Sequence, residues 1–139
     1  MIRWLEKGIV LLSCIMLTAC AAASQAGLCE EFDRSVKSYN RMIRWHEIEN
    51  AGMTYIEPEL RDRYMNQAES LKKRGLTVAD FRIVTSTCLP ERRVGDVVAE
   101  FDYYMMPSSK IKTVSYRQEW AYRENIKSWI LKTGLPVFE

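Results

Sequence analysis

The spacing of the apolar residues changes at Gly75, and this change restricts the fold more than any other feature of the sequence. Before Gly75, apolar side chains recur every three or four residues, which is the period of one helix face. After Gly75 they alternate with polar residues, as in strands with one buried face. Helices followed by consecutive strands predict an α+β domain, with N-terminal helices packed on a curved antiparallel sheet of about four strands.

Two helices are expected before Gly75. The first begins at Leu28 and ends near Gly52, where glycine is a stop signal. The second begins at Pro58, which suits a first helical turn, and ends after a basic triplet, just before Gly75. Between them, Met53–Ile56 is either a strand fragment or an extended link. The expected core stripes are Leu28, Phe32, Val36, Tyr39, Ile43 and His46 in the first helix, and Leu60, Tyr64, Ala68 and Leu71 in the second.

Four strands with short connections are expected after Gly75. Their alternating faces lie at residues 81–86, 97–105, 114–122 and 126–131. Pro, Gly, Ser and Asn separate them, so an antiparallel meander is favoured. The aromatic residues on these faces are interpreted mainly as core and cross-strand pairs.

Length and composition describe one ordinary globular domain. The chain has 139 residues, 47% hydrophobic and 27% charged, which excludes wholesale disorder. Its net charge of +2 gives no strong electrostatic field, so a nucleic-acid partner is not expected. We assign the single domain to residues 28–139.

Residues 1–19 are expected to be a lipoprotein signal peptide. Arg3 and Lys7 precede Gly8–Ala19, twelve residues that carry no charge at neutral pH when Cys14 is counted as neutral. A transmembrane helix needs about 20 apolar residues, so this shorter run fits the h-region of a secretory signal. A buried N-terminal helix is the alternative interpretation.

The segment Leu17–Cys20 (LTAC) resembles the bacterial lipobox. The resemblance implies a diacylglyceryl thioether on Cys20, cleavage before it, and acylation of the new N-terminus, for example with palmitate. Each buried CH₂ contributes about 0.8 kcal/mol, so three chains hold a protein on a membrane permanently. An Asp after the cysteine tends to retain Gram-negative lipoproteins in the inner membrane. Ala21 therefore implies the outer membrane, facing the periplasm, with residues 20–27 as lipidated cysteine and tether.

Four segments resemble a pattern found in bacterial lipoproteins with an NTF2-like domain. They are Tyr39–Trp45, Ile56–Arg61, Phe101–Tyr104 and Trp129–Pro136. The resemblance covers nearly all of residues 28–138 and implies a cone-shaped α+β fold with a cavity between helices and sheet. That fold usually has a further strand or hairpin before its long helix, and here only Met53–Ile56 is available for it.

The remaining cysteines are Cys29 and Cys88, once Cys14 leaves with the signal and Cys20 carries lipid. In a compartment that permits disulfides, they either pair or remain two free thiols. A bridge would close a loop of about 60 residues and stabilise the fold by about 4 kcal/mol in the chain-entropy model. With one histidine and no CxxC motif, neither a metal site nor a cofactor is expected.

Catalytic candidates are weak. NTF2-like enzymes place a His, Asp or Tyr in the cavity, and the candidates here are His46, Asp102, Tyr39 and Tyr103. For both His46 and Asp102, a structural role is the preferred interpretation. The residues proposed to line a pocket are Tyr39, Phe81, Phe101 and Tyr103.

Three functions follow from these patterns. The first is a non-catalytic interaction module, anchored in the envelope, that contacts another protein through a sheet face or edge. The second is a module that binds a small apolar ligand in the cone cavity. The third is an enzyme of the dehydratase or isomerase kind, which requires His46 and Asp102 to meet in one pocket. The sequence does not indicate an oligomeric state.

Overall fold

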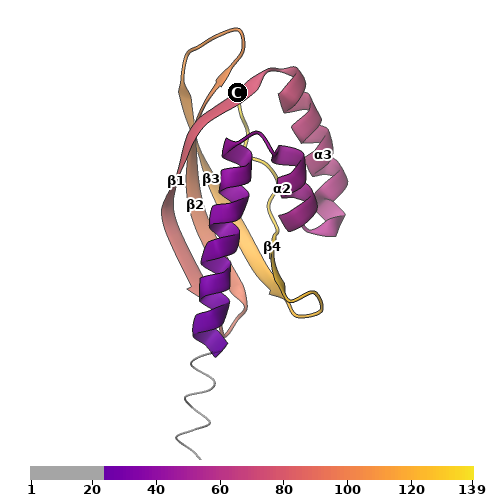
Figure 1. Ribbon diagram of the computed structural model, residues 1–139, viewed down its shortest axis with the longest axis vertical. Coiled ribbons are helices and arrows are strands. Elements are labelled where there is room, and N and C mark those ends of the chain that lie inside the picture. Colours follow the sequence, from indigo (N-terminus) through magenta and orange to yellow (C-terminus); the bar gives the residue numbers. More distant parts are fainter. Residues whose placement is uncertain (1–23) are drawn as a thin grey trace, which may run out of the picture.

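The computed structural model describes residues 24–139 (Figure 1). The predicted signal peptide, residues 1–19, and the predicted lipidation site Cys20 lie outside the described residues, so both stay predictions. The described part begins with an N-terminal helix over residues 24–44 and continues with α2 (Ile48–Tyr55) and α3 (Pro58–Lys73). Within residues 24–139, none of the helices has the length and apolar character needed to cross a membrane.

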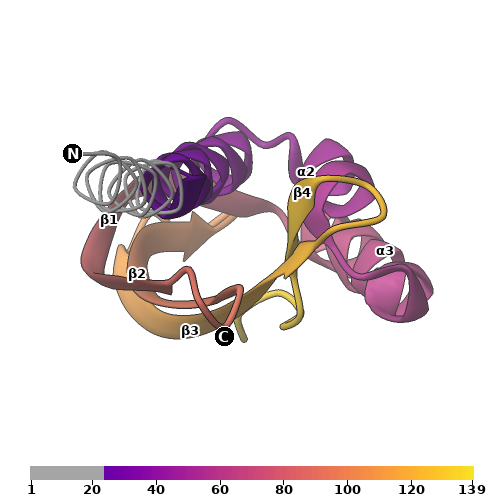
Figure 2. The ribbon, with the colours of Figure 1, turned by 90° about the horizontal axis from the view of Figure 1, so that it is seen from below.

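The sheet is an antiparallel meander of four strands. Strands β1 (Leu76–Leu89), β2 (Val94–Met105), β3 (Lys112–Arg123) and β4 (Ser128–Leu131) lie in the sheet in that order. The sheet curves around the N-terminal helix, and α2 and α3 lie beside β4 (Figure 2). The predicted α+β class, with helices on one side of a four-stranded antiparallel sheet, is confirmed.

The core lies between the helices and the inner face of the sheet. On β2 the inner side chains alternate with exposed or half-exposed ones, as the sequence predicts. Phe32 of the N-terminal helix packs on Trp129, with ring centroids 4.9 Å apart, and Tyr39 packs on Trp120 at 5.8 Å. The interpretation of the strand aromatics as core residues holds for Trp120 and Trp129, which are both buried.

The first helix is shorter at its C-terminal end than the sequence predicts. It ends at residue 44, and a turn containing His46 with φ 65° separates it from α2. The expectation of one helix ending at Gly52 is therefore wrong, because Gly52 lies inside α2. A Cβ on Gly52 would lie 2.3 Å from the Tyr64 ring, so this glycine allows α2 and α3 to approach closely.

Two other boundaries differ from the prediction. Residues 24–27, expected to belong to an extended tether, are helical. Residues 53–55 are also helical, and only Ile56 forms a strand-like contact, a parallel bridge to Leu131. The second predicted helix is confirmed: Pro58 is its first residue, and Gly75 follows it with φ 80°.

Candidate functional site

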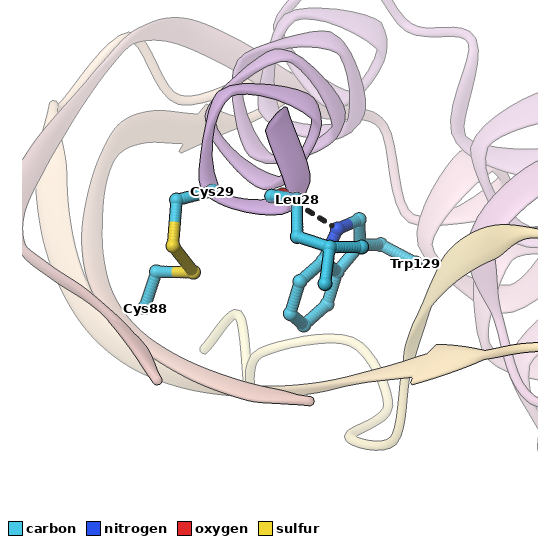
Figure 3. The surroundings of a disulfide bond; sticks show 4 residues. All are labelled: Leu28, Cys29, Cys88 and Trp129. Carbon is cyan, nitrogen blue, oxygen red and sulfur yellow. Dashed lines mark hydrogen bonds between the residues drawn. A yellow bond between two sulfur atoms is a disulfide. The ribbon is translucent and has the colours of Figure 1, made fainter. Parts of the chain in front are cut away.

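Cys29 and Cys88 form a disulfide (Figure 3), so the pairing hypothesis is confirmed over free thiols. Their Cα atoms are 5.7 Å apart, within the range that a disulfide requires. The bond joins the second turn of the N-terminal helix to the end of β1. On the other side of the same turn, the Trp129 indole N–H donates a hydrogen bond of 3.1 Å to the Leu28 carbonyl. The start of this helix is thus fastened to both β1 and β4, the two edge strands of the sheet.

The four predicted pocket residues lie in or against the core. Tyr39 and Phe101 are completely buried, Tyr103 is nearly so, and Phe81 packs against them as a partly buried residue. The Phe81 and Phe101 rings are 6.3 Å apart, and Phe138 packs on Tyr103 at 4.9 Å. Aromatic side chains therefore occupy the space where a ligand cavity was predicted. The contribution of Phe138 was missed, because a single aromatic residue near the chain end has no periodicity to reveal it.

A polar cluster is buried beside these aromatic residues. Asn40 and Gln118 are completely buried, and the Gln118 amide N–H donates to the Asn40 side-chain oxygen at 2.7 Å. Burial raises the pKa of Tyr116 to about 12, and its hydroxyl donates to the Gly134 carbonyl. Burial likewise raises the pKa of Tyr39 well above its ordinary value, and the Tyr39 hydroxyl has no hydrogen-bond partner among the described residues. The cluster stays uncharged at neutral pH.

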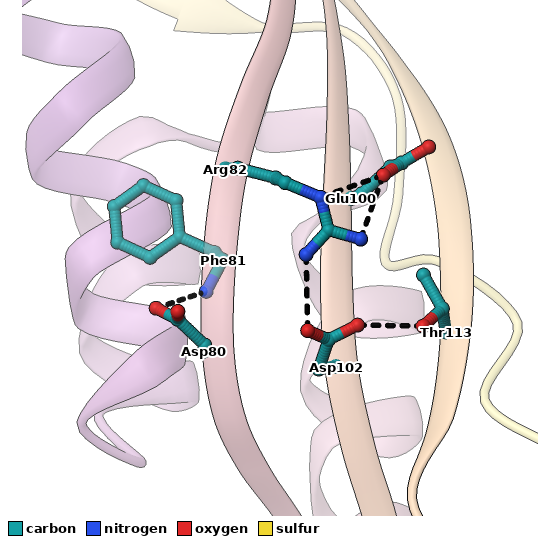
Figure 4. A network of polar contacts seen from close by, with 6 residues as sticks. All are labelled: Asp80, Phe81, Arg82, Glu100, Asp102 and Thr113. Carbon is teal, nitrogen blue, oxygen red and sulfur yellow. Dashed lines mark hydrogen bonds and ion pairs between the residues drawn. The ribbon is translucent and has the colours of Figure 1, made fainter.

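Asp102 belongs to a polar network on the outer face of the sheet (Figure 4). It accepts a hydrogen bond of 2.6 Å from the Thr113 hydroxyl and one of 3.0 Å from Arg82, which also pairs with Glu100 at 2.8 Å. The hydrogen bond from Thr113, with that from Arg82, holds the pKa of Asp102 below its ordinary value. An ionised carboxylate that is already paired on a solvated face is poorly suited to act as a general base.

The structure does not bring His46 and Asp102 together. His46 is exposed in the turn after the N-terminal helix, whereas Asp102 points away from the helices on the outer face of β2. The meeting in one pocket that the enzyme hypothesis requires is absent for this pair. Residues 24–139 also contain no group of three His, Cys, Asp or Glu side chains placed to hold a metal ion.

A groove of about 470 Å³ lies where the α2–α3 junction meets the turn between β3 and β4. We call it the junction groove. The sequence does not reveal this groove, because its walls come from residues 53–61 and 123–130, which only the folded chain brings together. It is lined by Met53, Thr54, Glu57, Pro58, Glu59, Arg61, Arg123, Asn125, Ile126 and Ile130.

The junction groove combines apolar and polar groups. Met53 and Ile126 are each 55% exposed and offer apolar surface to the groove. Glu57 and Arg123 form an ion pair across it. Arg61 donates one hydrogen bond of 3.2 Å to the Ile56 carbonyl, but its buried Nε–H has no acceptor among the described residues. A buried donor without an acceptor costs about 1–3 kcal/mol, and because this Nε–H is inaccessible to solvent, a ligand in the groove reaches it only if the Arg61 side chain moves.

The groove also borders β4, the short last strand of the sheet. Strand β4 pairs with β3 on one side, and within residues 24–139 its other side has only the bridge from Ile56 to Leu131. Trp129, Ile130 and Leu131 of this strand are buried and α2 lies beside it, so the edge is covered. The accessible part of this site is the junction groove itself, where the exposed side chains of Met53 and Ile126 can contact an apolar group of a partner.

Comparison with known proteins gives a fold likeness only. No protein-family model matches the chain, and no curated protein matches it either. Among solved structures, the intermembrane space region of the chloroplast protein ARC6 is similar, with a TM-score of 0.51 and 10% identity. The match covers 77% of this chain and 94% of the other. At this identity the likeness supports the α+β architecture and carries no information on activity.

Proposed function

We propose that this chain is a lipid-anchored periplasmic lipoprotein of the bacterial outer membrane, and that its NTF2-like domain is a non-catalytic interaction module. The Cys29–Cys88 disulfide is the observation that carries the proposal, because structural disulfides are typical of oxidising compartments outside the cytosol. The lipobox-like segment Leu17–Cys20 and the h-region before it support the same location.

We propose the junction groove as the contact site of this module. Its occupant is an extended segment of another envelope protein. The apolar side chain of that segment lies between Met53 and Ile126. This placement removes the exposed apolar surface of both side chains from water.

The two alternative functions have less support. An apolar ligand in the cone cavity would have to displace Tyr39, Phe101 and Tyr103, which pack in the core. A dehydratase or isomerase would need a base and an acid in one pocket, and His46 and Asp102 lie on different parts of the surface. An interaction module, by contrast, needs only an accessible contact site such as the junction groove.

Metabolic labelling with an alkyne fatty acid tests the anchor. We expect the probe to mark the wild-type protein and not the Cys20→Ala variant, and we expect outer-membrane fractions to contain the marked protein. An unmarked wild-type protein, or a marked Cys20→Ala variant, would refute lipidation at this residue.

Site-specific photo-crosslinking in cells tests the groove. A benzophenone side chain at Met53 is expected to capture one defined partner, whereas the same group at Met106, which is 58% exposed in the β2–β3 connection, is not. The purified partner should then bind the wild-type protein and lose affinity by about tenfold or more with Ile126→Asp, as expected when an apolar anchor is removed. Equal binding by Ile126→Asp and the control Met106→Asp would contradict the assignment.

A further inference from the structure

The N-terminal helix fixes which end of the domain faces the predicted anchor. Cys20 precedes Ser24, the first described helical residue, by four residues, and four residues span at most about 14 Å. The disulfide and the Trp129–Leu28 hydrogen bond hold the start of this helix to both edges of the sheet. The end of the domain next to Cys88 must therefore stay close to any membrane that holds Cys20.

The β1–β2 turn and the β3–β4 turn lie at this end of the domain and are joined to each other. The β1–β2 turn is closed by a 3.1 Å hydrogen bond from the Arg92 N–H to the Leu89 carbonyl. It is joined to the β3–β4 turn in two ways: Tyr122 donates its backbone N–H to the Arg93 carbonyl at 2.9 Å, and Arg93 pairs with Glu124 at 2.9 Å. The two turns therefore move together.

The two turns carry apolar and basic side chains. We call this set of residues the anchor-end surface: Leu89, Arg92, Arg93, Val94 and Lys127. All five residues are exposed, and Leu89 and Val94 flank the two arginines of the β1–β2 turn. Arg92 and Lys127 have no carboxylate within ion-pair distance among the described residues, while Arg93 is paired with Glu124. Glu91 is the opposing charge of the β1–β2 turn. Apolar residues next to free cations are suited to a phospholipid surface, where aliphatic groups enter the headgroup layer and cations meet phosphates.

We propose that the anchor-end surface rests on the phospholipid headgroups of the membrane that holds the protein. Leu89 and Val94 enter the headgroup layer, and Arg92 and Lys127 contact lipid phosphates. This inference rests on the proposed lipidation of Cys20. It places the β2–β3 connection, at the opposite end of the sheet (Figure 1), away from the membrane.

The test uses the full-length protein, purified from cells and reconstituted into phosphatidylethanolamine vesicles that contain phosphatidylglycerol. Intact mass first establishes whether the protein carries lipid. A nitrobenzoxadiazole label is then attached at Leu89→Cys or Val94→Cys, and at Met106→Cys as the control for the distant end. Bromine-labelled lipids quench a label that lies in the headgroup and upper acyl region.

We expect a lipid-modified mass, strong quenching at position 89 or 94, and little quenching at position 106. We also expect the charge reversals Arg92→Glu and Lys127→Glu to weaken quenching at position 89, whereas Lys110→Glu, in the distant connection, leaves it unchanged. Equal quenching at both ends on a lipidated protein would overturn the orientation and leave the proposed anchor intact. A mass without lipid would overturn the proposed function and this inference together.

Discussion

Removal of the Cys29–Cys88 disulfide is expected to destabilise the domain by about 4 kcal/mol. The bond joins residues 59 positions apart and so closes a loop of 60 residues. In the chain-entropy model, a loop of this length reduces the entropy of the unfolded chain by about 14 cal/mol/K, or about 4 kcal/mol at 25 °C. The Cys29→Ser/Cys88→Ser double variant leaves no thiol of the pair to react elsewhere.

Equilibrium unfolding in urea measures the effect. Trp120 and Trp129 are each 1% exposed, so their fluorescence reports loss of the core. With a denaturant slope of about 1–3 kcal/mol/M, the midpoint should fall by more than about 1 M. The wild-type protein in reducing agent serves as the matched control and should unfold with the double variant. A difference below about 1 kcal/mol between oxidised wild type and double variant would refute the loop-closure argument.

Three further outcomes follow from the packing. Gly95→Ala should destabilise the fold by about 1–3 kcal/mol, because its Cβ would lie 2.4 Å from the Phe32 ring. The control Gly27→Ala, whose Cβ would have nothing within 4 Å, should be neutral or stabilising by up to about 1 kcal/mol, and thermal unfolding of both variants measures the difference. Asn40→Leu and Gln118→Leu should each lower the free energy of unfolding by about 1–3 kcal/mol, because each leaves a buried amide without its partner. In urea unfolding, a double variant that loses the full sum of the two single losses would contradict their pairing. The free energy of unfolding should fall as pH rises from about 10 to about 12. The reason is that folded Tyr116, with its pKa raised to about 12, keeps a proton that the unfolded chain loses near pH 10. Tyr116→Phe should flatten this part of the plot of urea midpoint against pH.

The strands were predictable because their side chains face two different environments. On β2, the inner residues Val97, Ala99 and Phe101 are buried and alternate with more exposed ones, so the period of two is visible in the sequence. The stop at Gly75 was predictable for a similar reason, since its φ of 80° favours glycine and basic residues precede it.

The end of the N-terminal helix at residue 44 could not be predicted from the sequence in this way. His46 adopts a positive φ without being glycine, and it lies three residues after Ile43, on the expected core stripe of the first helix. Gly52, which looks like a helix stop, is required by the Tyr64 ring of another helix, and no local pattern records that contact. The junction groove was hidden for the same reason: Met53 and Ile126 are 73 positions apart, and only the tertiary fold makes them neighbours.

The double fastening of the N-terminal helix has a mechanical consequence. Tension applied from the N-terminal side reaches the covalent bond at Cys29 and passes directly into the end of β1. Strand β1 pairs with β2 from Leu76 to Leu89, through hydrogen bonds that lie across the strands. Tension along the strand therefore loads many of these bonds at once in shear, whereas a helix without the disulfide would peel from the sheet one turn at a time.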